Sequence, residues 1–383
     1  GPTSVGLGIE GSSANVESQL YLLRTRVEGL DVRVRAKGDF FDSLQSSVNR
    51  NRKYPEYWET VVRDRRMFPD HALSQIIDEQ YIEAMGELST ADVEDWLNAV
   101  YRPDNATLYV IGRFDGAAAM SLVDTYFADW TVEAPITHQI LDVAPPSDLP
   151  ERQVIIFNKE LVSQTNVSLS CLVEPRTEEN IQTHRVLGSV LSEMAWNALR
   201  EQSGVTYGAG SGVGVRGETT ATLGFNSLVQ NDASALAVST FLELPQLIQS
   251  GEFDQSLIPL MQVSAARQYV IGQQTTAQMM NRLSSVVDGG YGWDYFTDFS
   301  ARLAGVDLAS LQGEMERCVG HEIVTLLGPS DVIGPHLAAA GIEYEVFDYE
   351  AETDRLWADR DPSGWEDEME RRADREESTE GEE

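Results

Sequence analysis

Lysine is nearly absent from this chain of 383 residues: it occurs only as Lys37, Lys53 and Lys159, and 28 basic residues face 62 acidic ones. The formal charge of -34 argues against nucleic acid or an anionic membrane as a partner, because binding phosphates needs a positive field. It favours cationic peptides instead. The composition also suits a halophile's protein kept soluble in high salt, and genomic base composition is an alternative explanation for the excess of Arg over Lys.

Long apolar runs are missing as well. No stretch of about 18 apolar residues occurs, and no basic segment followed by an apolar one opens the chain, so neither a membrane span nor a signal peptide is predicted. The chain begins Gly1-Pro2 rather than with Met, which indicates tag cleavage, processing or truncation. Because an export signal would have preceded Gly1, the compartment is open, with the cytoplasm slightly favoured over a periplasmic or exported location.

Cysteine is scarce. Cys171 and Cys318 are far apart and lie in apolar contexts, so we expect two buried small hydrophobic residues and neither a disulfide framework nor a zinc cluster. No histidine has a second His or a Cys at ligand spacing. The histidines are His71, His138, His184, His321 and His336.

The hydrophobic content of 42% is enough for two domains with cores of their own. The order helix, strand, turn, helix occurs twice, with strands predicted at 106–112 and 322–328. The glycines that end these strands, Gly112 and Gly328, are 328 − 112 = 216 residues apart, which indicates two similarly folded domains rather than a solenoid. We therefore predict an α+β protein, in which each domain is a mainly antiparallel sheet with helices packed on one face.

A segment rich in Pro and Asp with little apolar periodicity marks residues 138–151 as the linker. This gives an N-terminal domain over 1–137, expected to be incomplete at its start, and a C-terminal domain over 152–350. Residues 351–383 are dominated by charged side chains, which is typical of an acidic, largely disordered tail.

The C-terminal domain opens with two β-like runs, RQVIIFN and QTNVSLSCLV, predicted to form a hairpin or adjacent strands. A long helix follows over about 177–201 and ends near Gln202, with Gly204 as its C-terminal cap. The next strand carries Tyr207, so Arg200 and Tyr207 are expected to converge across the turn. A forked guanidinium donor and a phenol at such a corner suit peptide carbonyl oxygens.

The stretch LREQSGVTYGAGS resembles the C-terminal-domain signature of the insulinase, pitrilysin and mitochondrial-processing-peptidase family of inverzincin zinc metallopeptidases. YRPDNATLYVIGRFD resembles the family's end-of-domain strand, and MFPDHALSQ its preceding loop. The resemblance runs from about residue 11 to about residue 349 in the family's order. It implies the metallopeptidase fold shared with LuxS and the mitochondrial processing peptidase, and it implies that Arg200 and Tyr207 bind the substrate backbone.

The family's zinc motif, H-x-x-E-H, is absent from the sequence. Alignment at Pro55 and Phe68 places the family's third zinc ligand near Ser46 or Ser47, and a neutral hydroxyl is a poor substitute for a carboxylate on Zn²⁺. We therefore predict no catalytic residue and no metal ligand in this chain. Zinc is expected in a partner subunit or in a missing upstream segment.

Three functions remain open. The favoured one is a non-catalytic subunit that closes a chamber over unfolded or cationic peptides, paired with a zinc-bearing subunit of the same family. The second is the C-terminal portion of an active zinc endopeptidase whose motif lies upstream of residue 1. The third is a scaffold subunit that has lost proteolysis, and the presence of Arg200 and Tyr207 argues mildly against it.

Overall fold

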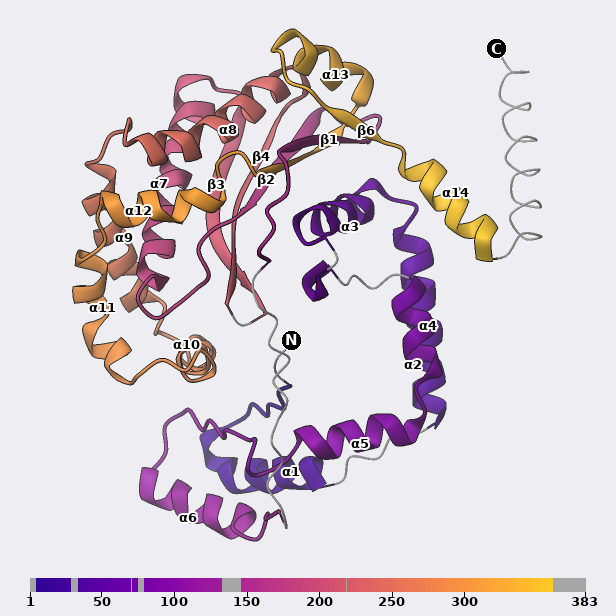
Figure 1. The fold of residues 1–383 in the computed structure, drawn as a ribbon. Helices are drawn as coiled ribbons and strands as arrows, with labels where there is room; N and C mark the ends of the chain where they lie inside the picture. The colour runs from indigo at the N-terminus through magenta and orange to yellow at the C-terminus, as the bar shows by residue number, and fades with distance from the viewer. Residues whose placement is uncertain are drawn as a thin grey trace.

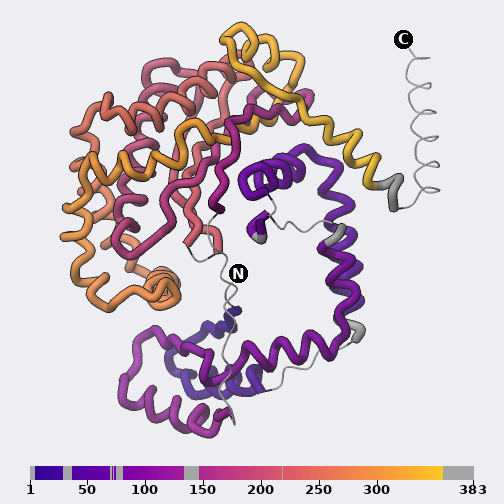
Figure 2. Tube along the Cα trace, in the orientation of Figure 1, coloured from indigo at the N-terminus to yellow at the C-terminus, as the bar shows by residue number. Residues whose placement is uncertain are grey.

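A computed structural model describes residues 5–28, 34–69, 71–74, 79–132, 146–217 and 219–360. The predicted mixture of helices and strands is confirmed: the C-terminal part is a sheet with helices layered on it (Figure 1). The N-terminal helices form an arc that starts beside the sheet at α3 and ends near α10 (Figure 2). At that far end the Tyr109 hydroxyl donates a hydrogen bond of 3.2 Å to Asp288 on α10.

The described strands are β1 (Gln153–Asn158), β2 (Gln164–Leu172), β3 (Thr206–Arg216), β4 (Thr220–Gln230), β5 (Ile323–Gly328) and β6 (Glu345–Phe347). The helices before them are α1 (Val16–Glu28), α2 (Val34–Asn51), α3 (Pro55–Met67), α4 (Glu79–Glu87), α5 (Thr90–Val100) and α6 (Gly116–Phe127). The later helices are α7 (Ile181–Trp196), α8 (Ser234–Ser250), α9 (Leu257–Ile271), α10 (Thr276–Asp288), α11 (Asp294–Ala304), α12 (Leu308–Glu314), α13 (Ser330–Ala339) and α14 (Tyr349–Arg360). The remaining helical turns are the 3-10 turns η1 (Ser13–Asn15), η2 (Ala72–Ser74), η4 (Asn231–Ala233) and η5 (Met315–Arg317) and the π-helix η3 (Asn197–Gln202).

The six strands lie in the order β3-β4-β2-β5-β1-β6. β5 is parallel to β1 and antiparallel to β2, and it separates these two strands. The expectation that β1 and β2 are direct neighbours is therefore wrong. Local patterning finds both strands, but it carries no information about a strand that arrives about 150 residues later.

One face of the sheet carries the main core. α7, α8 and α13 pack there against apolar side chains of the strands β1 to β5. α9, α11 and α12 extend this layer. The helices on this face agree with the prediction for the C-terminal domain.

The opposite face is divided. At the β1–β5 side, α3 packs on it through Trp58, Val61 and Phe68, so these strands are buried on both faces. Two charged groups of α3 are buried in this contact: Glu59 accepts a hydrogen bond of 2.7 Å from Thr325, and Asp64 pairs with Arg216. Towards β3 the same face carries small and polar residues: Ser168, Ser170, Gly210, Gly212, Gly214, Gly224 and Asn226.

The described N-terminal residues form helices. α5 begins as predicted, with Ser89 as its N-cap in a capping box with Asp92. The strand predicted at 106–112 is absent there, because no other strand lies beside this segment to complete a ladder. The domain boundaries remain a prediction, since residues 138–145 of the expected linker, with the preceding residues 133–137, lie outside the described residues.

The expected acidic tail starts as a helix, because α14 covers residues 349–360. Thr353 of α14 accepts a hydrogen bond of 3.0 Å from the indole of Trp58, which ties the helix to α3. Residues 361–383 lie outside the described part of the chain. Among the described helices, none is both long and apolar enough to cross a membrane.

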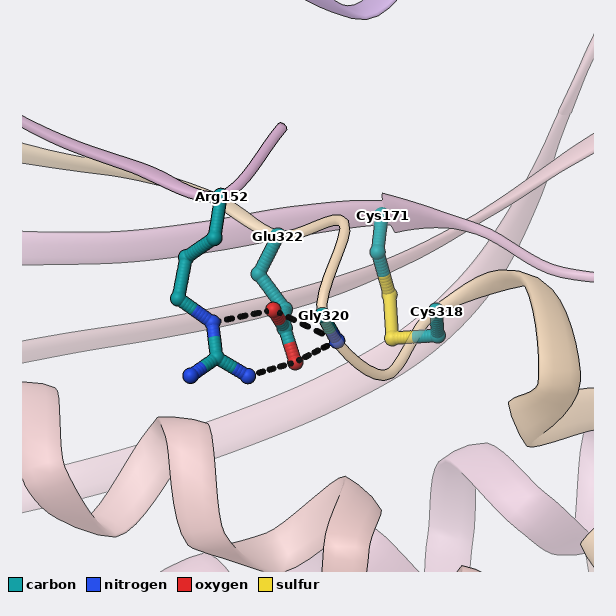
Figure 3. Close-up of a disulfide and its surroundings, with 5 residues drawn as sticks. All are labelled: Arg152, Cys171, Cys318, Gly320 and Glu322. Carbon is teal, nitrogen blue, oxygen red and sulfur yellow. Dashed lines mark hydrogen bonds and ion pairs between the residues drawn. A yellow bond between two sulfur atoms is a disulfide. The ribbon is translucent and has the colours of Figure 1, made fainter. Parts of the chain in front are cut away.

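Cys171 and Cys318 form a disulfide, so the expectation of two unlinked cysteines is wrong, although both are buried as predicted (Figure 3). Strand pairing explains the bridge. Ser170 on β2 pairs with Ile323 on β5, and this register brings Cys171 beside the turn that leads into β5. The sequence separation of 147 residues conceals this proximity.

A buried ion pair adjoins the disulfide (Figure 3). Glu322 is fully buried and accepts hydrogen bonds of 2.7 and 3.1 Å from Arg152 and of 3.1 and 3.2 Å from the backbone N–H of Gly320. The neighbouring His321 ring contacts the carbonyl of Pro150 at 2.8 Å. The contact of His321 and the ion pair of Glu322 therefore hold the start of β5 from both sides.

Removing the disulfide should destabilise the C-terminal part. We expect Cys171→Ala with Cys318→Ala to lower the free energy of unfolding by about 2–5 kcal/mol, because the bridge closes a long loop and restricts the unfolded chain. Urea denaturation measures this. Reductant should weaken the wild type and leave the double variant unchanged, and two titratable thiols in the unreduced, denatured wild type would contradict the bridge.

The contact between α3 and the sheet should depend on Arg216. Its guanidinium donates hydrogen bonds of 2.6 and 3.0 Å to Asp64, which is 6% exposed. We expect Arg216→Ala to cost about 2 kcal/mol, because it removes one partner of a buried carboxylate. Hydrogen exchange of the α3 amides measures the loss of protection.

The matched control is Arg66→Ala on α3, the helix that carries Asp64. Both side chains of the Arg66–Glu345 ion pair are exposed. This change should cost less than about 0.5 kcal/mol. Equal deprotection of α3 in both variants would show that the buried pair has no special role.

Candidate functional site

Arg200 lies where α7 changes its winding. α7 passes without a break into the π-helix η3, which ends at Gln202. Gly204 then has φ +66°, and its N–H donates to the carbonyl of Arg200 at 3.1 Å. Such positive φ values suit glycine, which confirms Gly204 as the predicted C-terminal cap.

Tyr207 is placed by an irregularity in β3. Thr206 pairs with Val229 and Ala209 pairs with Ser227, so β3 has one more residue than β4 between these pairs. This is the pattern of a β-bulge, which turns a side chain away from the regular alternation. Tyr207 lies in the bulge and is 83% exposed.

Two buried hydroxyls fix the bulge from the sheet side. The Thr206 hydroxyl lies 2.8 Å from the carbonyl of Gly208 and 2.7 Å from that of Leu228, and it accepts from the N–H of Gly208 at 3.1 Å. The Ser227 hydroxyl lies 3.0 Å from the Thr206 hydroxyl and 2.9 Å from the Gly208 carbonyl. Thr206 and Ser227 therefore determine where Tyr207 points, and a search for charged or aromatic residues in the sequence misses them.

Arg200 and Tyr207 do meet across the turn. The Arg200 guanidinium lies 5.4 Å from the centre of the Tyr207 ring, and its Nη1 donates a hydrogen bond of 3.2 Å to the carbonyl of Thr206. The other guanidinium N–H groups make no hydrogen bond to the described residues. Stacking on the ring orients these donors and leaves them available for carbonyl or carboxylate oxygens.

The strand that carries Tyr207 is an edge of the sheet. Among the described strands, β3 pairs with β4 alone, so alternate backbone N–H and C=O groups face outwards and suit an added peptide strand. α7 lies close against this strand: a Cβ on Gly188 would come within 3.0 Å of the Gly212 Cα. The Ser211 hydroxyl also donates to the Gly188 carbonyl at 2.8 Å. Glycine at position 188 therefore lets α7 pack closely on the edge strand, and the Ser211 hydrogen bond ties the two together.

The residues at the expected zinc position are Ser46 and Ser47 on α2. Within the described part of the chain, no group of three His, Cys, Asp or Glu residues is arranged to hold a metal ion. His184 is buried and contacts Glu314 at 2.9 Å in the helical layer, and His138 lies outside the described residues. The location of zinc in the intact system remains a prediction.

Comparison with known proteins agrees with this geometry. Residues 87–260 match the family model described as the peptidase M16 inactive domain. No curated protein matches the chain in sequence.

Solved structures share the fold at low identity. A peptidase M16 inactive domain from Pseudomonas fluorescens has a TM-score of 0.66 at 14% identity, with 83% of this chain and 76% of that chain covered. An M16-like peptidase from Alicyclobacillus acidocaldarius has a TM-score of 0.69 at 13% identity, with 82% and 75% covered. The first half of the periplasmic protease PqqL from Escherichia coli has a TM-score of 0.66 at 12% identity, with 89% and 75% covered. The sequence motifs, the family match over residues 87–260 and the fold agree in their resemblance to the peptidase M16 family, the family of insulinase.

Proposed function

We propose that this chain is the non-catalytic, peptide-gripping half of an M16 peptidase and that Arg200 and Tyr207 hold the backbone of the bound peptide. The observation that carries the proposal is the corner, the turn at which Arg200 and Tyr207 meet. The Arg200 guanidinium lies over the exposed Tyr207 ring, 5.4 Å from the ring centre, beside the edge strand β3. The guanidinium also has N–H donors that make no hydrogen bond to the described residues. The two side chains and the edge strand together offer the donors and acceptors that an extended peptide needs.

We further propose that this chain pairs with a zinc-bearing M16 half, and the resemblance to PqqL supports this arrangement. The first half of PqqL resembles this chain, and in a second structure of the PqqL protease the match covers only 35% of that chain. A two-half assembly separates the tasks: one half supplies zinc, and the other encloses the peptide and fixes its orientation. We propose that the partner is a zinc-bearing M16 subunit and that the substrates are unfolded peptides, with the net charge of -34 favouring cationic ones.

The disulfide bears on the compartment. Cys171 and Cys318 are joined, and disulfides persist mainly in oxidising compartments. We therefore favour a periplasmic or exported protein over a cytoplasmic one, which reverses the slight preference drawn from the sequence.

The corner can be tested with this chain alone. A fluorescein-labelled, unstructured cationic peptide should bind the full chain, as measured by fluorescence anisotropy. Arg200→Ala should weaken binding about 10- to 100-fold, because charge-assisted hydrogen bonds are lost, and Tyr207→Phe about 3- to 10-fold, because a single neutral one is lost. Arg113→Ala and Tyr54→Phe remove the same groups from exposed positions elsewhere and should leave the affinity unchanged. The clamp assignment is wrong if the corner variants bind as tightly as the wild type.

Zinc analysis separates the proposal from an active enzyme. We expect substoichiometric zinc by mass spectrometry in the full-length protein purified without chelator, and peptidase activity only after its zinc-bearing partner is added. Arg200→Ala should reduce that activity without dissociating the pair. One zinc per chain would instead support an active endopeptidase, and a pair whose activity ignores both corner substitutions would support a scaffold.

A further inference from the structure

A second group of arginines lies at the other end of α7. Arg185 is exposed near the start of α7, and its guanidinium lies 5.4 Å from the centre of the Phe299 ring on α11. Phe299 stacks on Tyr269 of α9, with 3.6 Å between the two ring centres. The Arg282 guanidinium of α10 lies 3.7 Å from the centre of the Tyr269 ring. Four helices thus bring two guanidinium groups to one pair of stacked rings.

Arg176 completes the cluster. It precedes α7, its Nη2 donates at 3.4 Å to the carbonyl of Val213 on β3, and its buried Nε has no acceptor among the described residues. Buried donors without a partner are uncommon in folded proteins and call for an explanation. Tyr295 lies nearby with its hydroxyl 3.2 Å from the Gln182 amide.

The cluster has positive charge that no neighbouring carboxylate neutralises. Arg176, Arg185 and Arg282 form no ion pair with the described acidic residues. The nearby Glu178 is held by Arg302 at 2.6 Å. In a chain with 62 acidic residues, a basic cluster kept apart from carboxylates is suited to an anion from outside.

The electrostatic interactions agree with the geometry. Burial, and then the charge of Arg185, lower the pKa of the Arg176 guanidinium. Burial also lowers the pKa of Arg282, and Arg185 again contributes. Arg185 therefore lies close enough to repel both neighbours, and a bound oxyanion would relieve that repulsion while filling the unused donors.

We propose that Arg176, Arg185 and Arg282 form a carboxylate-binding site for the C-terminal end of a peptide held at Arg200 and Tyr207. This inference rests on the proposed function. Arg185 and Arg200 are 200 − 185 = 15 residues apart along α7 and η3, so the two sites are separated by about 20 Å. An extended peptide spans that distance with about six residues. The site would therefore favour peptides whose C-terminal carboxylate lies about six residues beyond the backbone bound at Arg200 and Tyr207.

Two peptides that differ by one group test the site. They share an unstructured sequence of about 12 residues, long enough to span both sites, and end in either a free carboxylate or an amide. Anisotropy titrations with the full chain, at a constant ionic strength of about 0.15 M, give both affinities. We expect the carboxylate form to bind about tenfold more tightly.

Variants assign that preference to the cluster. Arg185→Gln, at an exposed position, should reduce the preference to about threefold or less, and Arg176→Gln should do the same. Arg113→Gln removes an equal charge from an exposed position in the N-terminal part and should leave the preference intact. The inference is overturned if the wild type binds both peptides equally, if neither peptide binds, or if Arg185→Gln and Arg113→Gln behave alike.

Two further arms separate the inference from the function on which it rests. Arg200→Ala should weaken both peptides by the same factor and preserve the preference. If it has no effect while Arg185→Gln still abolishes the preference, the corner assignment fails and the carboxylate site stands. Inorganic phosphate should compete with the carboxylate peptide only. If phosphate competes but the protein binds the carboxylate and amide peptides equally, the cluster binds a free anion and the inference is overturned.

Discussion

The structure depends on the insertion of β5 between β1 and β2. β2 ends at Leu172 and β5 begins at Ile323, yet their pairing is what completes the sheet. This one pairing places Cys318 beside Cys171, and it brings Glu322 to Arg152 at the first residues of β1. It also gives α3 its apolar contact surface, because Ile323 and Leu327 lie in the second core beside Trp58. The disulfide and the buried ion pair hold the same end of β5. They offset the entropic cost of closing the long loop between β2 and β5.

The two proposed sites take their geometry from that sheet. β3 is positioned by β4, β4 by β2, and α7 lies on β3 where Gly188 meets Gly212. One continuous helical segment therefore carries Arg185 near its start and leads to Arg200 just beyond its end, whereas Arg176 lies in the segment between β2 and α7. Rigid elements fix binding groups more accurately than loops do, so a substrate is compared with a fixed spacing rather than with an adaptable surface.

Local signals in the sequence predicted local structure well. Ser89 as a cap, Gly204 as a terminator and the two β-like runs that form β1 and β2 are each set by a few neighbouring residues. The convergence of Arg200 and Tyr207 follows from one turn. The errors are all non-local. The strand predicted at 106–112 lacks a partner, β1 and β2 are separated by β5, and the disulfide depends on strand register. The cluster around Arg185 was invisible for the same reason, because its arginines come from separate elements that only the tertiary fold brings together.

Both sites use arginine in the same physical way. Arg200 lies over Tyr207, Arg185 over Phe299 and Arg282 over Tyr269, and none of them forms an ion pair with a described carboxylate. A ring orients a guanidinium through its face and leaves the N–H edges unused, whereas a carboxylate would consume those edges and cancel the charge. In a chain of net charge -34 this distinction matters, because an acidic surface attracts cationic groups over a distance, while the stacked arginines retain donors for contact. In the proposed function, long-range attraction and short-range contact therefore act on different parts of the same peptide: its basic residues, and its backbone with a free carboxylate.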